Sequence, residues 1–275
     1  MRPRIGFDVD RATTQLRHLI TEADNVRSAS VTADRARAGY LLWVHDVEHA
    51  LHGLFTDVRL EKLHTARYWR IHSSPLSADD RPFELISDEL ELQTSWLRSI
   101  FDRLLDEASR AAHEGSAVAV PDTHALLHYR LFDEVRWTEI VSATPVRLVV
   151  PLRVVDELDA KKAARRRDLA DRAAAVLAHL EEYVGSELGK PQPLREAVTI
   201  EVFRAFEIDV DPRRVADPDT EILETCEALA LFGGEPVVLI TGDYGMRLRA
   251  TARDVAVARM PDELLIRAPT DAAGS

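Results

Sequence analysis

The spacing of hydrophobic residues changes near the middle of this chain. Up to about residue 115, apolar residues recur every three or four positions and glycines are few, which is typical of amphipathic helices. The spacing predicts helices near residues 11–25, 33–55, 59–71 and 82–113. Pro82 suits the first turn of the last helix. We expect the helices to pack as a bundle, because a bundle buries their apolar faces.

The last of these helices carries the clearest apolar stripe. Three tryptophans, Trp43, Trp69 and Trp96, also fall in apolar helical positions, so we expect them to pack in the core rather than to stack on nucleic-acid bases. The stripe consists of Leu85, Ile86, Leu90, Leu92, Trp96, Leu97, Ile100, Leu104 and Leu105.

From Ala117 onward, short apolar runs alternate with helical stretches. Short runs that are apolar throughout predict buried strands, and strands joined through helices predict a mostly parallel sheet covered on both faces. The predicted fold class is therefore an α/β domain of three layers, with helices on each side of the sheet, preceded by an all-α domain. The expected strands are residues 117–121, 146–150, 198–203, 236–240 and 255–258. The expected helices are residues 124–133 and 218–232, more than one helix over residues 154–184, and a short one from Gly245.

The sequence predicts two domains joined by a short linker. Gly115 follows the last N-terminal helix, where glycine readily adopts the left-handed conformation that ends helices. We assign residues 1–115 to a helical domain of unknown role, residues 116–268 to the α/β domain and residues 269–275 to a flexible tail.

Composition limits the kinds of binding site and the cellular location that we expect for this chain. The net charge of −12 argues against loose adhesion to nucleic acid, which depends on many Lys and Arg contacts to phosphate. Any nucleic-acid site must therefore be local and must carry metal ions or clustered cations. The single cysteine, Cys226, excludes an internal disulfide and a Cys-based zinc site. Because no signal-like or membrane-spanning apolar run occurs, we expect a cytoplasmic protein with no membrane partner.

Four acids of the α/β domain lie near the ends of predicted strands. Asp122 and Asp243 each follow a strand and open into a helix, whose positive terminus favours an ionised carboxylate. Glu157 comes shortly after the second strand, and Asp219 opens the helix that leads into strand 236–240. In an open parallel sheet, sites form beyond the carboxyl ends of the strands. Ionised oxygens placed there are what Mg²⁺ requires.

The segments around these acids resemble the four motifs of PIN domains, in order and in rough spacing. They are Asp122-Thr123, Pro151-Leu-Arg-Val-Val-Asp-Glu-Leu-Asp159, Asp219-Thr-Glu-Ile-Leu223 and Thr241-Gly-Asp243. The resemblance covers about residues 116–268. The Asp-Glu-Leu-Asp motif with the basic residues after it is especially similar to larger bacterial PIN domains that carry a separate additional module.

The resemblance implies a metal-dependent nuclease, most often a ribonuclease, that uses one or two Mg²⁺ or Mn²⁺ ions. It makes Asp122, Glu157, Asp219 and Asp243 the metal ligands, and it makes Thr241 a hydroxyl that orients a carboxylate. Such metal ions lower the pKa of a bound water and neutralise the leaving oxygen. The implied products carry 5′-phosphate and 3′-hydroxyl ends.

Two positions raise questions about the site. His124 stands where many family members have Asn after Asp-Thr, which changes or removes a hydrogen bond of that side chain. Asp217 lies two residues before Asp219, so either acid is available as the third ligand. Asp219 fits the family better, because the acid of the family motif precedes the Ile-Leu pair by three residues, as Asp219 does here. Asp217 then caps the helix beside the site, with Pro218 in the first turn.

A dense basic cluster flanks Glu157 in an otherwise acidic chain. Asp168 and Asp171 are spaced to pair with it, as on an ordinary solvated helix face. The functional alternative is contact with a phosphate backbone. The residues that we assign to nucleic-acid binding are Lys161, Lys162, Arg165, Arg166 and Arg247.

The sequence leaves three functions open. The favoured one is hydrolysis of RNA through the four carboxylates. A structure-specific DNA nuclease is an alternative, because related folds use similar acidic clusters on flapped DNA, although no helical arch or helix-hairpin-helix pattern occurs here. An inactive PIN domain that serves as a binding scaffold is the other, and His124 favours it. In the favoured function the helical domain selects a substrate, a protein partner or an oligomeric state, and in the scaffold it is the interaction surface.

Overall fold

The chain forms two compact units, and each is considered by itself. Met1–Ser109 belong to the first unit, and the described residues from Arg110 onward belong to the second. The division falls inside a helix, whereas the sequence placed the domain boundary after residue 115. The predicted tail, residues 269–275, lies outside the described part. The computed structural model describes residues 1–4, 7–29, 32–73, 75–112, 115–204, 217–233 and 235–266.

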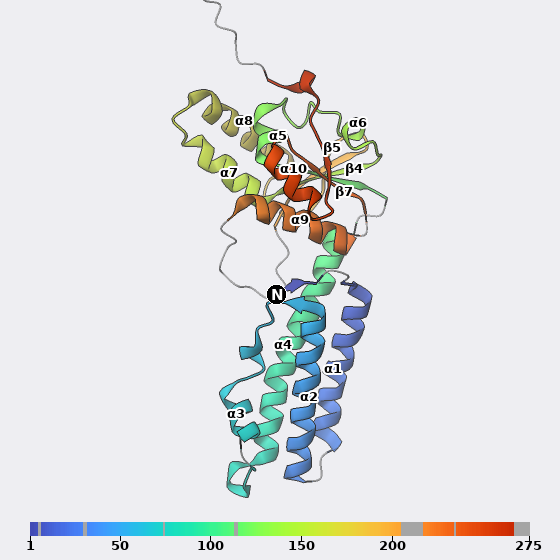
Figure 1. Ribbon diagram of the computed structural model, residues 1–275, viewed down its shortest axis with the longest axis vertical. Coiled ribbons are helices and arrows are strands. Elements are labelled where there is room, and N and C mark those ends of the chain that lie inside the picture. The colour runs from blue at the N-terminus through green and yellow to red at the C-terminus, as the bar shows by residue number, and fades with distance from the viewer. Residues whose placement is uncertain are drawn as a thin grey trace, which may run out of the picture. The chain divides into compact units, whose positions relative to one another are not determined.

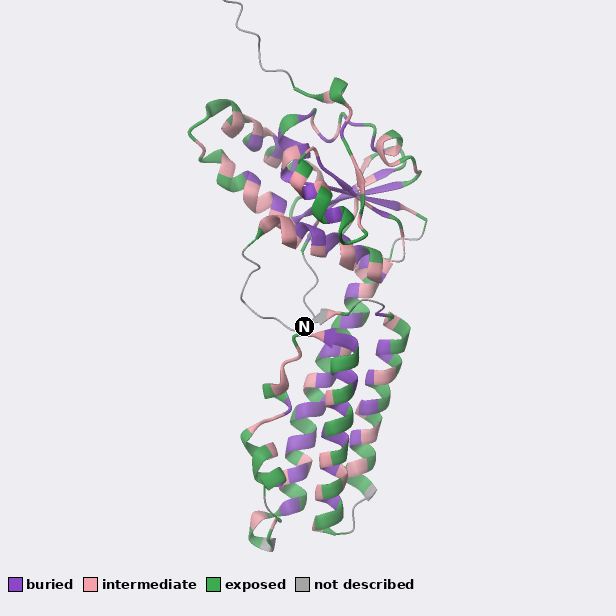
Figure 2. Cartoon of the chain, viewed as in Figure 1, coloured by how far each residue is buried: buried purple, intermediate pink, exposed green. Residues whose placement is uncertain are grey.

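The first unit is helical, as the apolar spacing predicted. Its long helices are α1 (Val9–Ala29), α2 (Ala33–Leu54) and α4 (Pro82–Ala111). Their buried residues face one another while their outer faces are exposed (Figure 2). A short antiparallel pair, β1 (Arg2–Pro3) with β2 (Phe55–Thr56), completes the unit at the end of α2.

The stretch 59–71 is not the single helix that the sequence predicted. It contains a 3-10 turn, η1 (Leu60–Lys62), and then α3 (Ala66–Ser73). The hydroxyl of Thr65 accepts the amide N–H of Tyr68 at 3.1 Å, which satisfies a free donor of the first turn. This local cap explains why a new helix begins there.

The apolar stripe of α4 includes polar residues that the sequence did not predict. Leu92 and Leu105 are exposed, whereas Glu89 and Gln93 are fully buried. The Gln93 amide donates to the hydroxyl of Tyr40 at 3.0 Å and to a backbone carbonyl at 2.7 Å. Buried polar groups need such partners, and those partners come from other segments of the unit.

The tryptophans differ in their surroundings. Trp43 is buried, and its indole N–H donates to the carbonyl of Leu19 at 2.8 Å. Trp69 on α3 is 50% exposed, so its assignment to the core is wrong. Its ring lies edge-on to Tyr68, with 5.1 Å between ring centroids. A short surface helix offers this side chain only partial burial.

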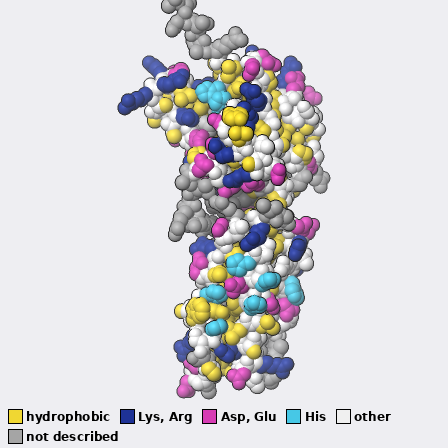
Figure 3. Space-filling model, viewed as in Figure 1, with side chains coloured by type: hydrophobic (Ala, Val, Ile, Leu, Met, Phe, Trp, Pro, Cys, Tyr) yellow, Lys and Arg dark blue, Asp and Glu magenta, His cyan; other side chains and the backbone are white. Residues whose placement is uncertain are grey.

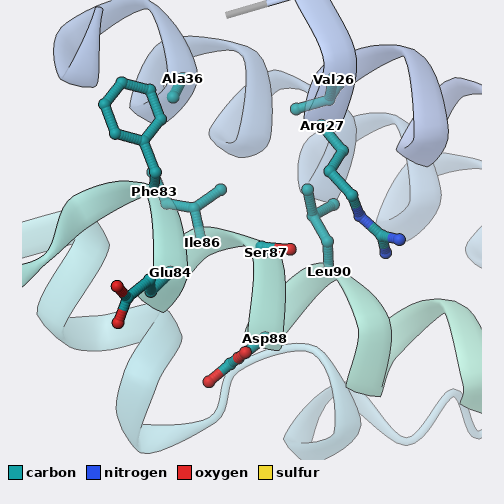
Figure 4. Close-up of a pocket in the computed structure, with 9 residues that line it drawn as sticks. All are labelled: Val26, Arg27, Ala36, Phe83, Glu84, Ile86, Ser87, Asp88 and Leu90. Carbon is teal, nitrogen blue, oxygen red and sulfur yellow. The ribbon is translucent and has the colours of Figure 1, made fainter.

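A groove lies in the first unit where residues of α1, α2 and α4 meet (Figure 4). Its apolar lining includes Val26, Ile86 and Leu90, and Phe83 at its edge is half-exposed. The guanidinium of Arg27 stands on the opposite side from Phe83 (Figure 4). The groove is therefore apolar along its floor and charged at its margin.

The second unit is built on a six-stranded sheet in the order β5-β6-β4-β3-β7-β8 (Figure 1). All its strand pairs are parallel except β5 with β6. Strands β3 and β4 are buried along their whole length, as expected for a sheet covered on both faces. The predicted mostly parallel α/β fold is confirmed. The strands are β3 (Ala117–Pro121), β4 (Val146–Pro151), β5 (Gln192–Arg195), β6 (Val198–Phe203), β7 (Val237–Ile240) and β8 (Ala256–Ala258).

Helices cover this sheet and connect its strands. α7 packs with α8 and against β4, α8 lies against β5 and β6, α9 against β7, and α10 against β8 (Figure 1). Within the described ranges, no helix is both long and apolar enough to cross a membrane. The helices are α5 (Thr123–His128), α6 (Trp137–Val141), α7 (Leu152–Lys162), α8 (Arg167–Val184), α9 (Pro218–Gly233) and α10 (Tyr244–Thr251).

The helix predicted over residues 124–133 ends early. Tyr129 forms an antiparallel bridge with Leu265, and the amide N–H of Arg130 donates to the carbonyl of Leu264 at 2.9 Å. These bonds to a distant segment replace the helical bonds that would continue α5. The helices predicted over 154–184 are present as α7 and α8.

A buried ion pair crosses from β4 to β6. Arg147 and Glu201 are both fully buried and hydrogen-bonded to each other. The two terminal nitrogens of Arg147 also donate to the backbone carbonyls of Ala111 and Arg110, each at 2.9 Å. Carbonyls in the last turn of a helix lack intrahelical partners, so Arg147 satisfies two of those at the end of α4.

Candidate active site

The carboxyl ends of β3 and β7 bring two predicted site residues together. Pro121 lies opposite Ile240 in these parallel strands, so the residues that follow meet at the same edge of the sheet. The buried hydroxyl of Thr241 donates to Oδ2 of Asp122. It also accepts the amide N–H of Asp243 at 3.0 Å. One threonine therefore links the residues that carry two of the four acids.

Asp122 and Asp243 also cap the helices that follow them. Oδ1 of Asp122 accepts the amide N–H of Ala125 at 2.7 Å, and Oδ1 of Asp243 accepts that of Met246 at 2.7 Å. Carboxylates are favoured at helix N-termini for this reason. The caps fix the direction of both side chains at the edge of the sheet.

Glu157 reaches the same edge from α7, the helix that follows β4. The hydroxyl of Thr123 donates to Oε2 of Glu157. Because Thr123 is the neighbour of Asp122 in the chain, this bond places Glu157 beside the end of β3. The side chain of Glu157 is only partly exposed.

Asp219 lies in the first turn of α9 and forms an ion pair with Arg249 of α10. Its charge also acts on Asp122, whose pKa it helps to raise. Asp217 lies just before α9, where it accepts a hydrogen bond from the hydroxyl of Thr220 at 2.5 Å. Asp217 therefore serves the helix end, while Asp219 is the acid near Asp122.

Burial changes the acidity of Asp122. The side chain is largely removed from solvent, and desolvation raises its pKa to about 6, against the lowering effect of the hydrogen bonds from Thr241 and Ala125. Both of these donors are neutral. A desolvated carboxylate held in this way gains stability from a nearby cation.

The four acids do not form an assembled metal-binding cluster in this structure. Among the described residues, no three His, Cys, Asp or Glu side chains gather closely enough to hold one metal ion. Glu157 is turned to the Thr123 hydroxyl, and Asp219 is paired with Arg249. The chemistry of the donors nevertheless fits Mg²⁺ or Mn²⁺, which prefer carboxylate oxygens. Joint coordination requires these carboxylates to approach one another more closely, and Arg249 competes with a metal ion for Asp219.

The sequence profile of the PIN domain matches residues 119–260. The chain belongs to the PIN-domain family. PIN domains form part of a nuclease superfamily and generally use divalent metals. The match includes every acid of the site and lies within the second unit, while the first unit has no family match. No curated protein matches the chain.

The PIN domain also contains a histidine pair that the sequence did not identify. His124 packs so closely on Gly242 that a Cβ atom there would stand 2.5 Å from Cε1 of the ring. Only glycine leaves room for this contact. The ring of His128, one turn further along α5, lies 4.6 Å from that of His124. The spacing of four residues was the available signal, because such positions share a helix face.

The basic cluster of the PIN domain begins near the end of α7. Arg166 pairs with Asp168 at 2.6 Å, two residues away rather than at helical spacing, and Lys162 pairs with Asp159 at 3.1 Å. The pKa of His128 is lowered by burial and further by the nearby charges of His124, Lys161 and Arg166. The cluster therefore lies close to the histidine pair. Figure 3 shows histidine side chains between the basic groups at the α7–α8 end and hydrophobic side chains over α10.

Proposed function

We propose that the PIN domain of this chain is a metal-dependent ribonuclease that hydrolyses phosphodiester bonds with one or two Mg²⁺ or Mn²⁺ ions. The observation that carries the proposal is the Thr241 hydroxyl, which links Asp122 to Asp243 at the carboxyl ends of β3 and β7. Sites of open parallel sheets form at this edge. Its position within the PIN match supports nuclease chemistry.

Asp122, Glu157, Asp219 and Asp243 are the proposed metal ligands. When bound, the metal would supply an acidified water and a positive charge for the leaving oxygen. Thr241 holds the Asp122 carboxylate in one orientation, and the two helix caps keep Asp122 and Asp243 directed at the same edge. Groups that are fixed in advance spend less free energy on ordering when metal or substrate arrives.

Contact with the RNA backbone is proposed for Lys161, Lys162, Arg165 and Arg166. All except the half-buried Lys161 are exposed, and exposed cations next to a site attract phosphate even in an acidic protein. RNA is proposed rather than DNA because RNA is the substrate that the family resemblance most often implies. Recognition of a partner or of a second copy by the helical unit stays a prediction.

The test is cleavage of labelled single-stranded RNA and DNA of the same sequence with Mn²⁺. It compares the native chain, the native chain in EDTA, and Asp122→Asn, which keeps the shape of the side chain but removes its charge. Asp171→Asn, an exposed acid on α8, is the matched control. We expect RNA cleavage that disappears in EDTA and in Asp122→Asn but not in Asp171→Asn.

Other outcomes overturn parts of the proposal. Equal cleavage by native protein and Asp122→Asn would place the activity outside this site. Preference for DNA would exclude a ribonuclease and favour the DNA nuclease. A folded native chain that leaves both substrates intact with Mn²⁺ would favour a PIN domain that acts as a binding scaffold.

A further inference from the structure

Tyr244 is an aromatic side chain placed in solvent beside the proposed site. It follows Asp243 directly and begins α10. With 67% of its surface exposed, it is the most exposed of the large hydrophobic residues that the structure describes. Isolated exposed apolar residues are common, so exposure alone assigns no role to Tyr244.

Arg247 contacts this ring. Its guanidinium carbon lies 5.5 Å from the centroid of the Tyr244 ring, within cation–π range. One of its terminal nitrogens donates to the carbonyl of Gly242 at 2.9 Å. The same guanidinium therefore contacts the ring and the backbone of the turn that carries Asp243. The Tyr244 ring thus has a cationic neighbour that is itself bonded to this turn.

The surroundings of the ring suit a nucleotide chain. The carbonyl of Gly242 accepts a hydrogen bond from Arg247, and the His124 ring packs on the same glycine. The His128 ring lies beside that of His124, near Lys161 and Arg166. Figure 3 shows this succession on one face, from hydrophobic side chains over α10 through histidine to basic groups at the α7–α8 end. Aromatic rings alongside a positively charged path are the features by which proteins bind unpaired bases and their phosphates.

We propose that Tyr244, supported by Arg247, is a stacking platform for one unpaired nucleobase next to the phosphodiester that the site would cleave. This inference rests on the proposed nuclease function for the identity of the ligand. Arg247 is then a positioning residue that acts through the ring, rather than a phosphate contact as the sequence suggested. A base-paired strand has its bases stacked within the duplex, so the platform favours single strands.

The test measures binding rather than cleavage, in the full chain with Asp122→Asn so that the probe stays intact. The probe is a fluorescent single-stranded RNA oligonucleotide, compared with a chain of the same length whose bases are replaced by hydrogen. Fluorescence anisotropy gives the dissociation constant for each. We expect Tyr244→Ala to weaken binding of the base-bearing probe by about 5- to 150-fold, the range for one stacked base, and to leave the abasic probe unchanged.

Conservative variants separate stacking from a structural effect. Tyr244→Phe and Tyr244→Trp keep a ring and should bind like the parent, whereas Arg247→Met should show a smaller loss that is again confined to the base-bearing probe. Leu188→Ala, which removes another exposed apolar side chain of the PIN domain, is the control and should change neither probe.

Two results would overturn the platform. One is equal binding of the base-bearing probe by Tyr244→Ala and its parent. The other is the same loss for both probes, which would make Tyr244 a support of the fold or a backbone contact. Because binding is read without cleavage, an inactive native chain would refute the nuclease proposal while leaving this measurement interpretable.

Discussion

Thr241→Val removes one oxygen from the centre of the proposed site while keeping the volume of a fully buried side chain. The Asp122 carboxylate loses a hydrogen bond that lowers its pKa, and the amide of Asp243 loses its acceptor. A hydrogen bond to a charged group contributes about 1.5–3 kcal/mol. Loss of a group that orients a metal ligand weakens metal binding by about 10- to 100-fold. At room temperature this factor corresponds to about the same free energy as the lost hydrogen bond. We therefore expect Mn²⁺ affinity to fall by this factor.

Electron paramagnetic resonance measures free Mn²⁺ directly and needs no RNA, so the titration separates metal binding from cleavage. Thr241→Ser restores the hydroxyl and should recover most of the affinity. Thr225→Val is the matched control, because this threonine is equally buried but its hydroxyl donates to the carbonyl of Glu221 within α9, at 2.9 Å. Native affinity in a folded Thr241→Val variant would refute the role assigned to this hydroxyl.

Two ion pairs and one buried carboxyl group of the PIN domain give three more measurable effects. Arg147→Met strands the buried Glu201 and should destabilise β4 and β6 by about 3–5 kcal/mol. Hydrogen exchange measures this loss, and native protection of both strands in the variant would contradict the prediction. Arg249→Met frees Asp219 and should tighten Mn²⁺ binding by at most about fivefold, because exposed pairs are weak; unchanged affinity would show that the pair does not compete with metal. The pKa of Asp122 in the folded protein without metal exceeds its ordinary value, so the folded state binds a proton at this carboxyl more tightly than the unfolded chain does. In EDTA, the free energy of unfolding should therefore fall as pH rises from about 4 to about 7. Urea unfolding at several pH values should show this slope in the native chain and lose it in Asp122→Asn.

Structural features that depend on residues close together in the sequence were predictable. Strand β3 was predicted with its observed bounds because it is apolar throughout and is followed by an acid. The positions of Asp122 and Asp243 at strand ends followed from the same pattern. Local caps, such as Asp217 before α9, also depend on residues only a few positions away.

Features that depend on distant contacts were not predictable in the same way. The bond between Thr241 and Asp122 joins positions 119 residues apart, and only the family motifs suggested a role for that threonine. No sequence spacing indicates that Arg249 pairs with Asp219 or that His124 needs a glycine at position 242. Strand β5 was missed because it is a short edge strand with alternating burial and a proline, so it lacks the apolar run of a buried strand.

The hydrogen bonds of Arg147 affect how the gene can be divided. A protein fragment of residues 116–275 would contain the whole PIN match. It would lack the backbone carbonyls of Arg110 and Ala111, to which Arg147 of the sheet donates. Its guanidinium would then be buried with two acceptors missing. Recombination or engineering that transfers this PIN domain to another protein must therefore include the final turn of the preceding helix, which lies before the first residue of the family motifs.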